Sequence, residues 1–393
     1  MIMDNQFNIT KLKDTVQDCS INFLLGSGVS MPYLSTLGKV EQFLTELTEK
    51  KDKGEITNDQ EKIIRVSIYK KFFDGVILKN LMILNGSNDA EDVLKNYKTF
   101  LKILNSILLN RKSTILNKQV NLFTTNVDIF LEKSLESTNV EYNDGFSGRF
   151  EPLFNLTNFK KSFFKTSLHY DNISELPVFN LMKIHGSLTW NKKEDESIAL
   201  SLDLELVKKI KSKKISEDKL IEVDDEKTID DLIIAANSKT PDNSTDEFIS
   251  EYEKLAIVNP TKEKFRETVL NRNYYELLRI YSNELEKENT ILFVAGFSFA
   301  DEHIRDVTIR AANSNPTLKI YIFSHSSDIE EGVKKINDAS INSNVEIVAP
   351  PQKENGAGGT DDEFKYNLET LNSKIFGELL KKIGEKEESK KPY

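Results

Sequence analysis

The sequence predicts an α/β fold, a Rossmann-like doubly wound parallel sheet with helical insertions. Two features carry this prediction. Six apolar runs of strand length lie along the chain, and most are apolar at consecutive positions, which is typical of strands buried on both faces. Segments with the 3.6-residue period of an amphipathic helix lie between several of these runs, and an alternation of strand and helix favours parallel strands.

The runs expected to form strands are, in chain order, Ile21–Leu25, Val120–Thr124, Val178–Ile184, Thr290–Ala295, Leu318–Phe323 and Asn344–Val348. The helices expected to alternate with them include Val127–Leu135, Lys262–Glu288, Ala300–Ala312 and Ile329–Ala339. A parallel strand can follow another only through such a crossover, so these helices are expected to cover the faces of the sheet.

Three segments depart from this alternation. Residues 40–115 contain two or three helical patterns and predict a helical insertion after the first strand. Residues 192–253 are polar and charged, which predicts a surface insertion with short helical pieces. Residues 361–393 predict an amphipathic helix followed by a charged tail. The first and last of these segments are candidate contact surfaces, although core packing explains their apolar faces equally well.

Composition excludes several classes of protein. The chain has 393 residues and a formal net charge of -10, so it repels a phosphate backbone, and we expect no direct contact with nucleic acid. Cys19 is the single cysteine, which excludes an internal disulfide and a four-cysteine zinc site, and we expect no metal site. No apolar run approaches the ~20 residues of a membrane span, and the N-terminus lacks a signal-peptide pattern. These features predict a cytoplasmic protein that does not enter a membrane.

The first predicted strand ends in a glycine turn, "INFLLGSGVSMP". Glycines let backbone N–H groups approach a phosphate, and Gly26–Ser30 meet that requirement. A P-loop needs a Lys followed by Ser or Thr, and the turn has no Lys. The dehydrogenase fingerprint needs a third glycine where Met31 stands. Alone, the turn fits a tight strand-to-helix connection as well as a nucleotide site.

Three other predicted strands also end in polar or small residues. "FTTNVD" places Asn126 and Asp128 at a strand end, "IHGS" places His185 there, and "GFSFAD" continues from Gly296 to Asp301. Ligands bind at the carboxyl ends of the strands in open α/β sheets. Each residue also has a structural reading, because Asn126, Asp128 or Asp301 can cap a helix and a single His is often structural.

In this order, the four motifs resemble those of the sirtuin family. The glycine turn with Ser30 is similar to the family's N-terminal NAD motif, and "TTNVD" resembles its Gln-Asn-Ile-Asp motif with Thr125 in the place of Gln. "HGS" matches the catalytic histidine motif, and "GFS" is similar to the later Gly-Thr-Ser turn. The resemblance implies that residues 1–393 form a sirtuin-like NAD-binding domain.

Two departures from the family separate this chain from its deacylases. The family's zinc ribbon needs four cysteines, and its acidic-Phe-Arg segment is replaced by "MPYLSTL". "YNDGFSGRFEP", "NPTKEKF" and "GFSFADEHI" resemble bacterial sirtuin-like proteins of anti-phage defence. The resemblance implies an NAD glycohydrolase that depletes NAD without zinc. It also implies a separate activator, such as a HerA-type ATPase or an Argonaute-like protein, and a homo-oligomer or hetero-complex that gates the site.

The resemblance also assigns roles to residues. His185 would accept a proton, and Asn126 would position the water and a ribose hydroxyl. The residues implied to bind NAD, the substrate, are Gly26, Ser27, Gly28, Val29, Ser30, Thr125, Asp128, Gly296, Phe297, Ser298 and Asp301. Two alternatives stay open: a catalytically silent module that binds NAD or ADP-ribose as a sensor or assembly subunit, and an ADP-ribosyltransferase.

Overall fold

The computed structural model describes residues 7–36, 38–113, 115–169, 171–258, 272–350 and 364–385. Its centre is a seven-stranded sheet in the order β13-β12-β11-β1-β2-β8-β3, in which every pair is parallel. The strands are β1 Ser20–Leu25, β2 Gln119–Thr124, β3 Glu141–Asn143, β8 Val178–Lys183, β11 Thr290–Ala295, β12 Lys319–Phe323 and β13 Val345–Val348. The predicted doubly wound parallel α/β fold is confirmed.

All six predicted strands are present, and their bounds differ from the expected ones by at most a residue at either end. The prediction lacked β3, which lies at the edge of the sheet. This strand has three residues and a mixed burial pattern, so it carries no continuous apolar run. The strands at the centre, such as β11, are buried along their whole length, which is why their continuous apolar runs predicted them.

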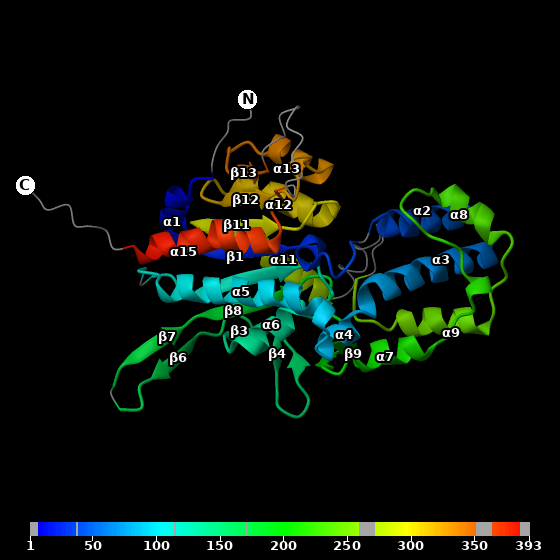
Figure 1. The fold of residues 1–393 in the computed structure, drawn as a ribbon, viewed down its shortest axis with the longest axis horizontal. Coiled ribbons are helices and arrows are strands. Elements are labelled where there is room, and N and C mark those ends of the chain that lie inside the picture. The colour runs from blue at the N-terminus through cyan, green and yellow to red at the C-terminus, as the bar shows by residue number, and fades with distance from the viewer. Residues whose placement is uncertain are drawn as a thin grey trace, which may run out of the picture.

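Helices cover both faces of the sheet (Figure 1). Alternate residues of β1 face opposite sides: Phe23 packs into one hydrophobic cluster and Leu24 into the other. The first cluster includes apolar residues of α1 Ile9–Asp18, α5 Glu91–Leu109, α6 Phe130–Thr138 and α15 Gly377–Gly384. The second includes residues of α11 Arg272–Leu285, α12 Glu302–Ser314 and α13 Glu331–Ala339.

A ladder of asparagines crosses the buried interior of the sheet. Asn121 Nδ2 donates to Asn22 Oδ1 at 2.7 Å, Asn180 Nδ2 to Asn121 Oδ1 at 2.9 Å, and Asn143 Nδ2 to Asn180 Oδ1 at 2.9 Å. These residues are direct partners in the registers of neighbouring strands. Asn121 also donates to the buried carboxylate of Glu284 on α11, at 3.1 Å. The ladder therefore lies between the sheet and α11.

A helical lobe lies beside the sheet (Figure 1). It combines helices from both predicted insertions: α2 Val40–Asp52, α3 Asn58–Phe72, α7 Glu205–Ser212, α8 Ile229–Ala236 and α9 Asn243–Tyr252. Helix α3 packs against α2, α8 and α9. The rings of Tyr69 and Tyr252 stack with centroids 4.1 Å apart, and Phe248 is also buried. The short helices of the polar segment 192–253 thus supply one half of this lobe and part of its buried core.

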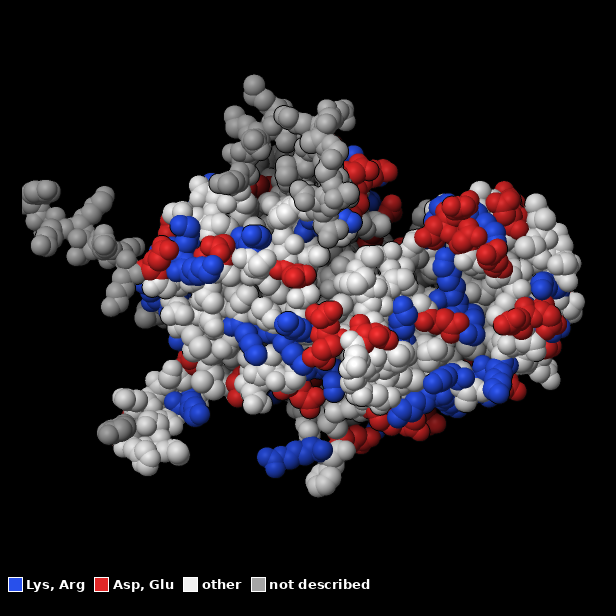
Figure 2. Space-filling view, in the orientation of Figure 1, with Lys and Arg blue, Asp and Glu red and all other residues white. Residues whose placement is uncertain are grey.

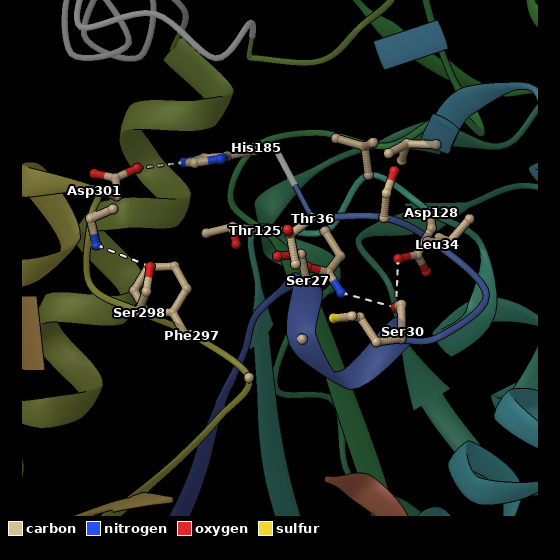
Figure 3. A pocket seen from close by; sticks show the side chains of 18 of the residues that line it. Ser27, Ser30, Leu34, Thr36, Thr125, Asp128, His185, Phe297, Ser298 and Asp301 are labelled. Atoms are coloured by element: carbon tan, nitrogen blue, oxygen red, sulfur yellow. Dashed lines mark hydrogen bonds and ion pairs between the residues drawn. The ribbon is translucent and has the colours of Figure 1, made fainter. Parts of the chain in front are cut away.

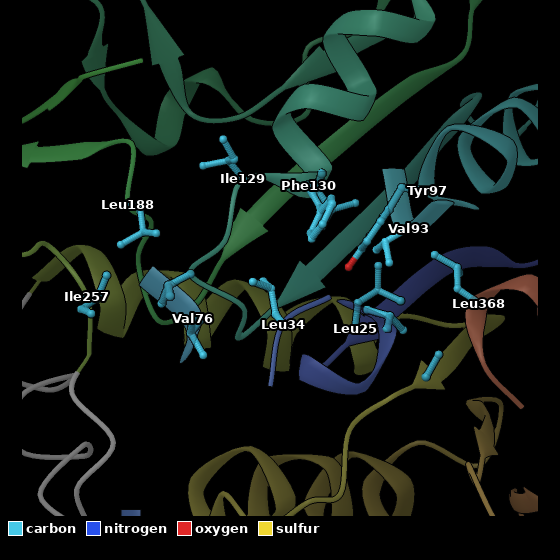
Figure 4. Packing of buried hydrophobic residues seen from close by; sticks show 14 of the residues in the cluster. Leu25, Leu34, Val76, Val93, Tyr97, Ile129, Phe130, Leu188, Ile257 and Leu368 are labelled. Carbon is cyan, nitrogen blue, oxygen red and sulfur yellow. The ribbon is translucent and has the colours of Figure 1, made fainter. Parts of the chain in front are cut away.

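The segment 40–115 contributes to two parts of the molecule. After the lobe helices, the chain passes through a π-helical turn at Phe73–Ile77 and α4 Asn80–Leu84, and then returns to the sheet as α5. Helix α5 packs against α6 and the C-terminal helix, and Figure 4 shows Val93 and Tyr97 among the buried residues near Leu25 and Phe130. The expected single insertion is therefore a lobe segment followed by a core helix.

The C-terminal helix forms as predicted. It runs through α14 Leu368–Thr370, a π-helical turn at Leu371–Phe376, and α15. Phe376 lies 5.5 Å from the ring of Phe23, so the apolar face of this helix is used in the core. Core packing also accounts for the apolar face of α5, which leaves these two helices as weak candidates for partner contact. The charged tail after residue 385 lies outside the described residues.

The boundaries of the other predicted helices shift at their N-termini. Helix α6 begins at Phe130, three residues later than expected, because residues 125–129 leave the strand without helical structure and Asp128 Oδ1 accepts the amide of Phe130 at 3.0 Å. Helix α12 begins at Glu302 with Asp301 as its cap, as the sequence suggested. The part of the predicted helix at 262–271 and the motif "NPTKEKF" lie outside the described residues.

Smaller elements project from the core. A four-stranded antiparallel sheet contains β4 Phe146–Ser147, β5 Leu153–Phe154, β9 Trp190–Lys192 and β10 Ile198–Leu200, and a separate hairpin contains β6 Phe163–Thr166 and β7 Ile173–Leu176. Within the described residues, no helix combines the length and apolarity that crossing a membrane requires.

Figure 2 shows basic and acidic side chains interspersed over the visible face, in the sheet region and in the lobe. This face carries no broad basic field.

Candidate active site

The candidate site lies where the direction of the sheet's winding changes. The chain leaves β1 toward β2 and β8 on one side, and later returns to place β11 on the other side of β1. A crevice forms at the carboxyl ends of two such strands, and it is the usual ligand site of open α/β sheets. The turn after β1, Gly26–Ser30, and the turn after β11, Gly296–Ser298, therefore meet at this point.

The two glycine turns pack directly on each other. The amide of Gly26 donates to Ala295 O at 3.0 Å, and that of Gly28 donates to Gly296 O at 3.0 Å. A Cβ on Gly26 would lie 2.3 Å from Gly296 O, and one on Gly296, where φ is +61°, would lie 2.5 Å from the amide nitrogen of Val29. The glycines are thus required by the contact between the turns.

This packing decides which amides can face a ligand. The amides of Gly26 and Gly28 are occupied, and that of Val29 donates to Gly26 O at 3.3 Å. Ser27 is the first residue of a 3-10 turn, where an N–H group has no acceptor within the turn. Its amide is the donor of the first turn best placed for an anionic group. The sequence predicted that several amides of this turn would face a phosphate. In the structure the amides of Gly26, Gly28 and Val29 donate to backbone oxygens of the protein, so Ser27 is the candidate donor among these four residues.

A cavity of about 430 Å³ opens beside the two turns. Every residue implied by the sequence lines it except Gly26 and Val29, which lie behind its wall. Figure 3 shows Ser27 and Thr125 near the middle of the cavity, the pair His185 and Asp301 on one side, and the Ser30–Asp128 hydrogen bond on the other. Four segments that are far apart in the sequence thus meet in one space.

Ser30 is the centre of a buried hydrogen-bond network. Its Oγ lies 2.9 Å from Asp128 Oδ2, 2.9 Å from Tyr97 OH and 3.3 Å from Asn126 Nδ2. A carboxylate only accepts, so the single Ser30 proton goes to Asp128, and Tyr97 and Asn126 donate to the two lone pairs. The hydroxyl of Ser30 is therefore fully used by the protein. It holds Asn126 and Asp128 in place and has no capacity left for a phosphate.

The second donor of Asn126 is also engaged. Its Nδ2 donates to Gly26 O at 3.0 Å in addition to Ser30, and its backbone N–H donates to Thr124 Oγ1 at 3.0 Å. Both N–H bonds of the amide thus point into the protein. The atom that Asn126 can offer to a ligand is Oδ1, an acceptor suited to a hydroxyl or a water molecule.

Asp128 is largely buried at the cavity wall, with Lys183 and hydrogen-bond donors around it. Burial raises the pKa of its carboxyl, while the nearby Lys183 acts in the opposite direction. Lys183 Nζ is itself buried, contacts the backbone oxygen of Asp128, and lies 2.7 Å from Glu132 Oε1. Burial and the Asp128 charge raise the pKa of Tyr97 well above its usual value, so this phenol remains a donor. Asp128, Ser30 and Tyr97 thus belong to one buried polar network in which each has a hydrogen-bond partner.

His185 and Asp301 form a second polar group. His185 Nε2 lies 3.2 Å from Asp301 Oδ2, and both side chains are largely buried. Asp301 was expected as a helix cap and as an NAD-binding residue. It is the cap of α12, and its second carboxylate oxygen contacts the histidine. The structure thus connects the motif "GFSFAD" to the motif "IHGS".

Several residues that line the cavity carried no recognisable signal in the sequence. Glu41 and Phe72 come from the helical lobe, Val76 comes from the π-helical turn that follows it, and His325 and Glu330 follow β12. The lobe residues lie in ordinary amphipathic patterns, so only the folded chain shows that they reach the site.

Among the residues beneath the cavity, Tyr97 looks like an ordinary core residue of an amphipathic helix. Lys183 did carry a signal, because a lysine inside the apolar run "VFNLMKIHGS" needs a buried partner.

Among the described residues, no group of three or more His, Cys, Asp or Glu side chains is arranged to hold a metal ion. The chain matches no protein-family model, and it has no match among curated proteins.

Proposed function

We propose that this protein hydrolyses NAD at the bond between nicotinamide and ribose, and that it acts in anti-phage defence by depleting NAD. The observation that carries the proposal is the convergence of the four motif segments on one cavity at the carboxyl ends of β1, β2, β8 and β11. Their resemblance to sirtuin motifs rests on sequence alone, and their meeting in space adds independent support.

The reaction breaks one bond and forms another. The bond between C1′ of the ribose and the nicotinamide nitrogen breaks, and its electron pair stays with nicotinamide, which leaves as a neutral molecule. Water attacks C1′, which carries positive charge in an oxocarbenium-like transition state, and loses a proton. The products are ADP-ribose, nicotinamide and one proton. The protein must orient NAD, hold the water molecule and receive the proton.

The residues of the cavity suit these tasks. His185 supplies an imidazole, a side chain suited to accept a proton from water or from a ribose hydroxyl near neutral pH. Asn126 offers Oδ1 to the water or to a ribose hydroxyl, since its N–H groups are occupied. The amide of Ser27 and the turn Gly296–Ser298 face the space where the phosphates and the adenosine would lie. Asp128, assigned to the nicotinamide amide by the resemblance, lines the same cavity.

The proposal is tested by following NAD and its products by chromatography with wild type, His185→Ala and Asn126→Ala. We expect both substitutions to reduce turnover by about 100-fold or more, the range of a lost general base or of a lost positioning group. Thermal unfolding must accompany the assay, because Asn126→Ala also removes two buried hydrogen bonds. Persistent turnover in both folded variants would exclude these residues as the catalytic pair.

A silent binding module is the second candidate, and one observation favours it. The N–H groups of the Asn126 amide and the hydroxyl of Ser30 are all engaged in hydrogen bonds within the protein. These polar groups therefore stabilise the fold around the cavity. Such a module would bind NAD or ADP-ribose without releasing nicotinamide. Calorimetric binding without turnover would support it, and transfer of label from NAD to a macromolecule would instead indicate an ADP-ribosyltransferase.

We further propose that the activity is gated by assembly, either with further copies of the chain or with an activator such as a HerA-type ATPase or an Argonaute-like protein. A constitutive NAD hydrolase would harm its own cell, so activity must depend on a second state of the protein. The cavity wall formed by the lobe residues Glu41 and Phe72 and by Val76 of the adjoining turn provides a part of the site that such an event can move.

A further inference from the structure

Asp301 is held in one orientation by the helix that it caps. Its Oδ1 accepts the amide of His303 at 3.1 Å and that of Ile304 at 3.3 Å, which are donors of the first turn of α12. With this oxygen fixed by the backbone, Oδ2 is directed to His185 Nε2 at 3.2 Å. The side chain of Asp301 is 6% exposed, so water has little access to the contact.

The backbone of His185 is fixed as well. The carbonyl oxygen of His185 accepts the amide of Val258 at 2.9 Å, and the next residue, Gly186, forms an isolated bridge with Ile257. Gly186 has φ of +78°, and a Cβ there would lie 2.1 Å from Ala256 O. The backbone of His185 is thus held by its hydrogen bond to Val258 and by the bridge at Gly186. Its ring contacts the Asp301 carboxylate, which the amides of α12 hold in place.

We propose that Asp301 is the positioning residue of His185. The carboxylate accepts a hydrogen bond from Nε2–H, which fixes the neutral ring in the tautomer with its lone pair on Nδ1. Nδ1 is then the atom that receives a proton, and the Asp301 charge stabilises the imidazolium that results. This consequence for catalysis rests on the proposed NAD hydrolysis. The tautomer itself follows from the contact between the two side chains.

Asp301→Asn tests this inference with little change in shape. The Asn side chain retains an oxygen that can cap α12. It presents N–H instead of a carboxylate oxygen to Nε2, which favours the opposite tautomer, with the proton on Nδ1. We expect kcat to fall by about 100-fold or more while KM changes by less than about threefold, as for a group that acts on the base and not on the substrate.

A spectroscopic measurement separates positioning from stability. The chain has four histidines, so the ¹⁵N spectrum of protein labelled at histidine can be assigned with a His185→Gln reference. In wild type we expect the signals of a ring protonated at Nε2, and in Asp301→Asn those of a ring protonated at Nδ1. Asp242→Asn is the matched control, because Asp242 caps α9 in the same way and is exposed to solvent.

Each outcome bears on the inference. A wild-type ring protonated at Nδ1, or a spectrum unchanged in Asp301→Asn, would overturn it, and so would faster turnover in that variant. If Asp301→Asn does not fold, Asp301→Ser keeps a capping oxygen without the carboxylate, and its His185 ring must no longer show protonation fixed at Nε2. If the wild type never cleaves NAD but its His185 ring is protonated at Nε2 and changes tautomer in Asp301→Asn, the proposed function is refuted and the positioning role of Asp301 stands.

Discussion

The hydroxyl of Ser30 can take part in three hydrogen bonds, and the protein uses all of them. Tyr97 and Asn126 donate to it, and it donates to Asp128. All four residues are buried, so a group that loses its partner here is poorly compensated by bulk water. The serine of the glycine turn therefore connects the first strand to the residues that follow the second, and determines how Asn126 and Asp128 face the cavity.

Ser30→Ala should accordingly destabilise the protein strongly. Three buried polar atoms would lose a partner, and each unsatisfied group costs about 1–3 kcal/mol, so we expect the free energy of unfolding to fall by about 3 kcal/mol. Urea unfolding measures this loss. Tyr97→Phe is the control, because it removes one donor and leaves the bond from Ser30 to Asp128. An equal or larger loss in Tyr97→Phe would show that the network does not centre on Ser30.

At the scale of elements, the asparagine ladder fixes how the strands pair. Asn22, Asn121 and Asn180 each occupy the third position of a strand, and the parallel register places them side by side. A shift of one strand by a single residue would separate their amides and bury them without partners. A buried polar ladder of this kind favours one register among the many that apolar strands allow.

Asn121→Val should reveal this role. The substitution removes the donor to Asn22 and to the buried Glu284 carboxylate, and the acceptor of Asn180. We expect a loss of about 3 kcal/mol in the free energy of unfolding, since several buried partners are left unsatisfied. Chemical unfolding of the variant provides the measurement. Asn88→Ala, at an exposed position, should change it by less than about 0.5 kcal/mol, and a similarly small change in Asn121→Val would contradict the argument.

The elements that the sequence predicted well share one property, a continuous apolar run. The central strands have it, and their carboxyl ends carried the site motifs, so both the sheet and the place of the site could be predicted. Strand β3 and the β6–β7 hairpin are short and partly exposed, and local pattern does not distinguish them from loops. The lobe was missed as a unit because its halves, near Tyr69 and Tyr252, are distant in sequence and meet only by tertiary packing.

At the scale of the whole molecule, the cavity lies between the sheet and the lobe. The segment after the first glycine turn joins the two parts. Ser35 Oγ donates to Gly75 O at 3.3 Å, Lys79 Nζ donates to Tyr33 O at 2.9 Å, and the amide of Lys39 donates to the Asp225 carboxylate at 3.1 Å. This segment also lines the cavity, so a displacement of the lobe would change the shape of the site.

Gating by assembly should therefore depend on this connection. We expect the specific activity to rise with protein concentration or on addition of a HerA-type or Argonaute-like partner, and size-exclusion chromatography should show a larger species under the same conditions. Asp225→Ala removes the acceptor of the Lys39 amide and should reduce the ratio of activated to basal turnover several-fold, because coupling energies of this kind are about 1–3 kcal/mol.

The control for this experiment lies in the same lobe. Asp230 is exposed and pairs with Lys50 at 3.0 Å, which connects α8 to α2 within the lobe and leaves the segment at Lys39 untouched. Asp230→Ala should keep the activation ratio, since an exposed ion pair contributes little to stability. If both variants lose activation equally, the lobe as a whole transmits the signal without Asp225. A monomer that is equally active at every concentration and with each partner would refute gating itself, because activity would then need no second state.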